Sequence, residues 1–223
     1  MVALAQDAWD NGLEMDLKGT PTVVINGQEY RGPLDFDPLS QTVDLVSKLA
    51  VVEERQFSEC PPMTVDPLKE YYATMHTEKG DIVIKLWPDV APFAVNSFIF
   101  LAENDWYDNT TFHRVLQDFV AQGGDPSGTG AGNPGYLFSL EVSTAVTFDR
   151  PGLFAMANSG PTSNGSQFFI TYSAQPGLNG RFTIFGEVVE GMDVVESLTL
   201  RDPQTDPDAP PGDLILDVTI EVR

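Results

Sequence analysis

Short runs of alternating apolar and polar residues fill most of the chain beyond residue 70. In YYATMHTEKGDIVIKLWPD the alternation continues on both sides of Lys79-Gly80, which predicts two strands that each bury one face. Further runs follow closely: TTFHRVL, DFVAQGG, LFAMAN, SQFFITY, FTIFGEVV and LILDVTIEV. Many short strands with Gly-rich turns favour a closed antiparallel barrel, and an open sandwich is the alternative on pattern alone.

Two stretches of this region have helical spacing instead. In APFAVNSFIFLAEN, Ala94, Phe98, Leu101 and Ala102 stand at i, i+4, i+7 and i+8, which predicts a helix with one apolar face. Pro92 suits the start of such a helix. The second stretch is GMDVVESL, and we expect no other helices in the barrel region.

The N-terminal third has a different pattern. Residues 19–32, GTPTVVINGQEYRG, place Asn-Gly between two strand-like runs, which is a strong hairpin signal. Apolar residues then fall at helical intervals from Pro38 to about Arg55, and FSECPPMTVDPLK has the proline content of a linker. We therefore expect three parts: a small α/β segment over 1–56 (helix, β-hairpin, helix), a Pro-rich linker over 57–70 and a β domain over 71–223.

Charge and composition exclude several functions. The chain has 33 Asp and Glu against 12 Lys and Arg, a net charge of -21, so nucleic acid and anionic membrane surfaces are not expected partners.

The single cysteine, Cys60, excludes an internal disulfide, a CxxC pair and a thiolate zinc cluster. With only His76 and His113 as imidazole ligands, we expect no metal. No basic start followed by an apolar run, and no stretch near the roughly 20 apolar residues of a membrane span, is present, so we expect a soluble chain without its own export signal. The sequence does not indicate in which cellular compartment the protein acts.

The candidate functional residues lie in two stretches, FHRVLQDFVAQGGDP (112–126) and MANSGPTSNGSQFFI (156–170). Gln167 and Phe169 are two positions apart, so they share a face if this part is a strand. No G-x-S-x-G elbow or Ser-His-Asp spacing is present. GTGAGNPG (128–135) lacks the Lys-Ser/Thr of a phosphate loop, so it is most simply a loop, with an anion-binding nest as the alternative.

These motifs, together with FGEVVEGMDVV, resemble cyclophilins, the peptidyl-prolyl cis-trans isomerases, from about Tyr71 to the C-terminus. The resemblance implies an eight-stranded antiparallel barrel capped by two helices, an active groove on its outer surface and no cofactor. It places the catalytic arginine on Arg114. The substrate-binding positions that it implies are His113, Phe119, Val120, Gln122, Ala157, Asn158, Gln167, Phe169, Leu178 and Phe182.

Single residues in this set have plainer interpretations. An arginine on a barrel strand is often solvated or ion-paired, and isolated phenylalanines are mostly core residues. We predict that His113 is structural and hydrogen-bonded within the barrel wall, because rotating an X-Pro bond needs no general base. Gly177 stands at the family's frequent Trp position and Phe182 at a frequent His position, which predicts a drier rim and reduced affinity for cyclosporin-type inhibitors.

The stretch GTPTVVINGQEYRGP and the helix after it resemble the last part of thioredoxin-fold disulfide oxidoreductases, with Pro21 at their cis-proline position. The CxxC motif is absent, so no redox role follows. An isolated hairpin is marginally stable in water, and we expect this segment either to dock on the barrel or to pair with a second copy in a homodimer. Another interpretation is a remnant of a longer exported protein, with an extracytoplasmic parent.

The predicted function is therefore isomerisation of exposed X-Pro bonds in peptides and unfolded proteins, which assists protein folding. The alternative is a cyclophilin-fold binding module for proline-containing segments with little turnover. Arg114, Phe119, Gln122 and Phe169 favour the enzyme, whereas Gly177 and Phe182 leave room for the binding module.

Overall fold

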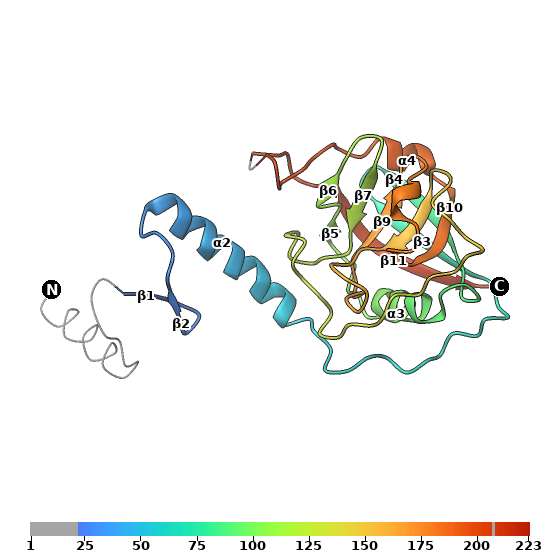
Figure 1. Ribbon diagram of the computed structural model, residues 1–223, viewed down its shortest axis with the longest axis horizontal. Helices are drawn as coiled ribbons and strands as arrows, with labels where there is room; N and C mark the ends of the chain where they lie inside the picture. The colour runs from blue at the N-terminus through green and yellow to red at the C-terminus, as the bar shows by residue number, and fades with distance from the viewer. Residues whose placement is uncertain (1–21, 207) are drawn as a thin grey trace, which may run out of the picture. The chain divides into compact units, whose positions relative to one another are not determined.

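The computed structural model describes residues 22–206 and 208–223 (Figure 1). The chain divides into two compact units, the first ending at Ser47 and the second spanning Lys48–Arg223. The described part of the first unit contains an antiparallel hairpin of β1 (Val23–Ile25) and β2 (Gln28–Tyr30), followed by α2 (Phe36–Glu53), which continues into the second unit.

The predicted hairpin and helix are confirmed within this described part. Asn26 and Gly27 have φ values of 47° and 76°, the left-handed conformation that a two-residue hairpin turn requires and that Asn-Gly adopts readily. Helix α2 begins at Phe36, two residues before Pro38, so the proline lies in the first turn, where its missing N–H is harmless. The helix predicted before the hairpin, and Pro21, lie outside the described residues.

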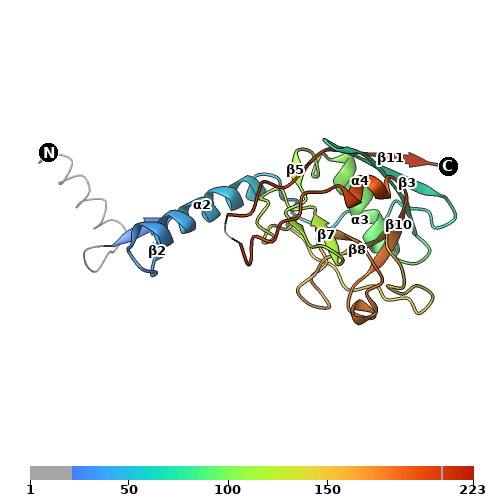
Figure 2. The same ribbon diagram turned by 90° about the horizontal axis from the view of Figure 1, so that it is seen from above.

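The second unit is built on one curled antiparallel sheet of nine strands in the order β5-β11-β3-β4-β10-β8-β9-β7-β6 (Figures 1 and 2). In chain order the strands are β3 (Tyr71–Thr77), β4 (Gly80–Leu86), β5 (Thr110–Thr111), β6 (Arg114–Val115), β7 (Val120–Gly123), β8 (Leu153–Met156), β9 (Phe168–Thr171), β10 (Ile184–Glu190) and β11 (Leu214–Val222). The mostly-β architecture is confirmed, whereas the strand count is nine instead of the expected eight.

The extra strand arises where the chain changes partner. The run TTFHRVL forms two strands of two residues, because β5 pairs with β11 and β6 pairs with β7. Only Phe112 and His113 separate these strands, which are the two edges of the sheet, so the sheet curls until its edges are neighbours in sequence. This place is also where the catalytic arginine was predicted.

The inside of the curl is an aromatic core. Phe154 contacts Phe98 edge to face at 5.2 Å between ring centroids and lies 4.5 Å from Phe185. Trp106, Tyr107, Phe112 and Phe168 are buried in the same cluster. Large aromatic side chains contribute much of the apolar area that such a core removes from water.

Helices α3 (Pro92–Glu103) and α4 (Met192–Glu196) lie on opposite sides of the barrel in Figure 1, and a 3₁₀ turn, η1, spans Pro176–Leu178. Both predicted helices are confirmed, but α3 is buried on more than its predicted apolar face. Its buried Asn96 accepts hydrogen bonds from Thr64 N at 2.8 Å and Val65 N at 3.2 Å and donates to Pro62 O at 3.0 Å. The proline-rich stretch therefore packs along α3.

Candidate active site

Three side chains from neighbouring strands stand in one row on the outer face of the sheet. Arg114 in β6 pairs with Gln122 in β7, and Gln122 pairs with Phe169 in β9. Residues directly opposite one another in antiparallel strands project to the same side. A cation, an amide and an aromatic ring are therefore neighbours across three adjacent strands.

This row opens into a groove of about 540 Å³. Every site residue predicted from sequence except His113 lines it: Arg114, Phe119, Val120, Gln122, Ala157, Asn158, Gln167, Phe169, Leu178 and Phe182. The structure adds small and polar lining residues from the Gly-rich loop and from residues 159–166, among them Gly130, Gly132, Asn133 and Ser163. The size fits a short peptide segment, since small-ligand pockets typically span about 300–1,000 Å³.

The apolar end of the groove belongs to a second hydrophobic cluster, separate from the inner core. Phe169 is only 4% exposed and stacks on Phe148 at 5.8 Å, while Phe182 meets its ring edge to face at 5.4 Å. Val120 and Leu178 belong to the same cluster. Because Phe169 is held on two sides, its ring offers a rigid wall to a ligand.

The polar end is fixed by a chain of amide hydrogen bonds. Gln122 Nε2 donates to Gln167 Oε1 at 3.0 Å, and Gln167 Nε2 donates to the carbonyls of Gly130 at 2.9 Å and Gly132 at 3.0 Å. Asn158 Nδ2 donates to Asn164 Oδ1 at 3.2 Å. Satisfied amide networks of this kind restrict side-chain motion.

The Gly-rich loop 128–135 is organised around a buried carboxylate. Asp125 accepts hydrogen bonds from Ser127 N at 2.8 Å, Gly130 N at 2.7 Å and Gly132 N at 3.1 Å. These N–H groups are the ones an anion nest would need, and Asp125 already uses them. The stretch is therefore a loop, and the nest alternative is wrong.

His113 does not line the groove. Its side chain is buried, and neither ring nitrogen has a hydrogen-bond partner among the residues that the structure describes, so the hydrogen bonding we predicted for it is not found there. Burial lowers the pKa of His113 to about 4, against the opposing effect of the Asp125 carboxylate, while Arg201 and Arg114 lower it further. His113 is consequently a neutral wall residue near pH 7.

The sequence patterns did not predict two features of the site. The first is Asp202, whose Oδ1 accepts a hydrogen bond from Arg114 Nε at 3.3 Å, so Arg114 is ion-paired as well as lining the groove. The second is a supporting segment, residues 52–57. Gln56 Nε2 donates to Asn133 O at 3.2 Å, and Phe57 N donates to Pro134 O at 2.9 Å, both in the Gly-rich loop.

Comparison with known proteins identifies the fold. The family model described as "Cyclophilin type peptidyl-prolyl cis-trans isomerase/CLD" matches residues 72–220. The chain belongs to this family. The activity of this cyclophilin is accordingly peptidyl-prolyl cis-trans isomerisation.

Relatives and solved structures agree over the same region. The "Probable peptidyl-prolyl cis-trans isomerase A" of Mycobacterium bovis is 45% identical over 172 residues, covering 67% of this cyclophilin and 94% of the relative. The "Peptidyl-prolyl cis-trans isomerase B" of Streptomyces anulatus is 42% identical over 173 residues, covering 70% and 99%. A crystal structure of a cyclophilin type isomerase from Cryptosporidium parvum aligns with a TM-score of 0.63 at 34% identity, covering 69% of this chain and 98% of that one. That protein was also solved in the presence of the dipeptide Ala-Pro.

A metal-ligating cluster and a membrane-spanning helix are both absent from the described residues. Across 22–206 and 208–223, no group of three or more His, Cys, Asp or Glu side chains is placed to hold a metal ion. No helix in those ranges has the length and apolar content needed to cross a bilayer.

Proposed function

We propose that the groove on the outer sheet face isomerises X-Pro bonds, with Arg114 as the catalytic residue. The observation that carries this proposal is the row of Arg114, Gln122 and Phe169, which puts a cation, an amide and an aromatic wall on one face.

The chemistry follows from the amide bond. Rotation must overcome about 18–20 kcal/mol because twisting destroys amide resonance. In the twisted state the proline nitrogen regains a lone pair and becomes a better hydrogen-bond acceptor. A guanidinium near that nitrogen therefore binds the transition state more strongly than either planar isomer, which lowers the barrier without proton transfer or a covalent intermediate.

The rest of the groove would hold the substrate. Phe119, Val120, Phe169 and Leu178 supply an apolar surface for the pyrrolidine ring, with Phe182 at its rim. Gln122, Gln167 and the segment at Ala157 and Asn158 supply polar groups for the peptide on one side of the bond, so that only the other side rotates. Exposed X-Pro segments of peptides and unfolding proteins are the substrate class that fits.

The main rival is a binding module that holds proline segments with little turnover. The two functions separate in one experiment, in which exchange between the cis and trans signals of a short X-Pro peptide is followed by NMR with a substoichiometric amount of the full chain. An enzyme accelerates the exchange in proportion to its concentration. Line broadening from binding without faster exchange would favour the binding module and overturn the enzyme proposal.

We further propose that the first unit mediates a homodimer. Its described part exposes apolar side chains, with Phe36 81% and Val43 46% exposed, and its two-stranded sheet is short. Exposed apolar surface and open strand edges favour pairing. Light scattering of the full chain would show twice the chain mass of 24.4 kDa, whereas a single-chain mass would reject the dimer. The likeness of this segment to a thioredoxin-fold C-terminal part remains a prediction without a redox role.

A further inference from the structure

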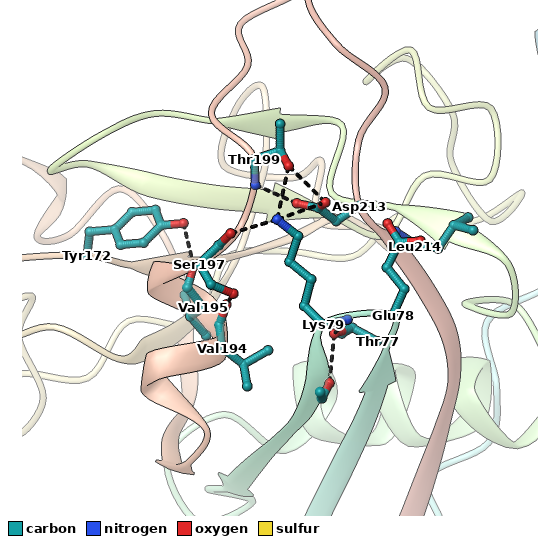
Figure 3. Close-up of polar contacts among 11 residues, drawn as sticks. Thr77, Glu78, Lys79, Tyr172, Val194, Val195, Ser197, Thr199, Asp213 and Leu214 are labelled. Atoms are coloured by element: carbon teal, nitrogen blue, oxygen red, sulfur yellow. Dashed lines mark hydrogen bonds and ion pairs between the residues drawn. The ribbon is translucent and has the colours of Figure 1, made fainter.

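The segment between α4 and β11 is tied at both of its ends to one polar network (Figure 3). Asp213, only 5% exposed, accepts hydrogen bonds from the backbone N–H of Thr199 and from Thr199 Oγ1, the latter at 2.9 Å. Lys79 Nζ lies 2.7 Å from Ser197 O, 3.1 Å from Thr199 Oγ1 and 3.3 Å from Asp213 Oδ1. The network thus joins the β3–β4 hairpin, the end of α4 and the start of β11.

Just beyond Thr199 the segment pairs with the strand that carries Arg114. Arg201 N donates to Val115 O at 2.9 Å, and Val115 N donates to Arg201 O at 2.8 Å. This isolated bridge fixes the backbone of residue 202 beside the start of β6. Asp202 then begins a turn in which its carbonyl accepts hydrogen bonds from Thr205 N at 3.1 Å and Asp206 N at 2.9 Å.

The Asp202 side chain therefore has a fixed position, and that position is next to the Arg114 guanidinium. Asp202 Oδ1 lies 3.3 Å from Arg114 Nε, and the two side chains are only 20% and 23% exposed. Among the residues that the structure describes, Nε is the atom of Arg114 with a protein hydrogen-bond partner. Arg114 also lines the groove, and no hydrogen bond joins its Nη groups to the described residues.

We infer that Asp202 is a positioning residue, which orients Arg114 through Nε so that the Nη donors point at the proline nitrogen of a bound substrate. The inference rests on the proposed catalytic role of Arg114. A flexible arginine must lose rotamer freedom when it meets a substrate, and a carboxylate that restrains it beforehand lowers that cost. The acceptor atom, more than the charge, is what positioning requires, so an amide in the same place should substitute for the carboxylate.

The test compares Asp202→Ala, Asp202→Asn and the control Asp208→Ala in the full chain. Asp208 is an exposed acid of the same segment, whose removal changes the net charge by the same amount as Asp202→Ala. For a proline peptide we expect Asp202→Ala to lower kcat about tenfold with KM nearly unchanged, because a small misplacement of a catalytic group is costly. We expect Asp202→Asn to keep at least half of the parent kcat and Asp208→Ala to match the parent.

A second readout does not depend on activity. The ¹H–¹⁵N signal of the Arg114 Nε–H should shift, and its hydrogen should exchange faster with water, in Asp202→Ala but not in Asp208→Ala. If the parent isomerises the peptide and Asp202→Ala matches it in kcat, the positioning role is overturned while the isomerase function stands. If the parent fails to isomerise but the Nε–H signal still responds to Asp202→Ala, the contact is supported and the proposed function is what fails.

Discussion

The ammonium group of Lys79 lies 3.3 Å from the carboxylate of Asp213, whose side chain is only 7% exposed. Lys79 belongs to the turn of the first barrel hairpin, whereas Asp213 precedes the last strand, so the pair joins the two ends of the domain in space. Removing one partner of a buried ion pair leaves the other charge without compensation.

We therefore predict that Lys79→Met lowers the free energy of unfolding by about 2 kcal/mol, the order of size for stranding a buried, hydrogen-bonded carboxylate that keeps its Thr199 donors. The measurement is urea denaturation followed by circular dichroism. The matched control is Lys85→Met, because Lys85 pairs with the exposed Glu70 at the surface. Equal losses for the two variants would contradict the structural importance of the Lys79 network.

His113 should make stability pH-dependent in a definite direction. Its pKa is about 4 in the folded chain, below its ordinary value of 6.5. Between these pH values the unfolded chain binds a proton at this position and the folded chain does not. The stability that His113 provides is thus complete above pH 6.5 and is lost as the pH falls toward 4, about 3 kcal/mol at the lower end.

The measurement compares the free energy of unfolding at pH 7.5 and 4.5 for the parent and His113→Gln. The same acidic groups titrate in both proteins, so the difference between them isolates His113. We expect His113→Gln to lose about 2–3 kcal/mol less than the parent over this interval. Identical pH curves for the parent and His113→Gln would contradict the buried neutral imidazole.

Segment 52–57 should count as part of the isomerase unit. Val52 is 2% exposed and Phe57 packs edge to face on Phe100 at 4.8 Å, while Gln56 and Phe57 bond to the loop that lines the groove. A chain starting at Lys48 should retain the parent's kcat/KM and stability of the barrel. A chain starting at Ser58 should lose about 3 kcal/mol of unfolding free energy, mainly the burial of Val52 and Phe57, and should show a raised KM. Thermal denaturation and peptide kinetics of both truncations check this, and equal KM values would refute the supporting role.

We predict that the residue at position 177 affects inhibitor affinity. A Cβ added at Gly177 meets no atom within 4 Å, so the backbone there has room for a side chain. We predict that Gly177→Trp binds a cyclosporin-type inhibitor at least tenfold more tightly than the parent, since it adds an aromatic wall with an indole N–H donor. Gly177→Ala is the control, and we expect it to bind like the parent. Tight inhibition of the parent in a direct titration would contradict the predicted low affinity of the parent for these inhibitors.

Local patterns in the sequence predicted the barrel strands, because alternation decides which face of a strand is buried. The spacing of Gln167 and Phe169 predicted that they share a face, and both line the groove. The resemblance of the motifs around Arg114 to those of cyclophilins indicated the other groove residues. The Asn-Gly pair between two strand-like runs also predicted the hairpin at Asn26-Gly27.

What sequence could not supply are contacts between distant segments. Asp202 lies 88 positions from Arg114, and nothing in an acidic loop distinguishes it from the other carboxylates there. Gln56 and Asn133 are 77 positions apart, and their contact depends on how the proline-rich stretch returns to the barrel. The division of one predicted strand at Phe112 and His113 depends on which neighbour each half finds.

The isomerisation rate of Arg114→Ala tests the central claim most directly. We predict that kcat/KM for a short X-Pro peptide falls about 100-fold to 1,000-fold, the usual effect of removing a donor aimed at developing transition-state charge or lone-pair density. Arg114→Lys should recover part of the rate, because it restores the cation without the planar guanidinium. Circular dichroism should show that both variants stay folded. An Arg114→Ala rate within twofold of the parent would contradict the assignment of Arg114 as the catalytic residue.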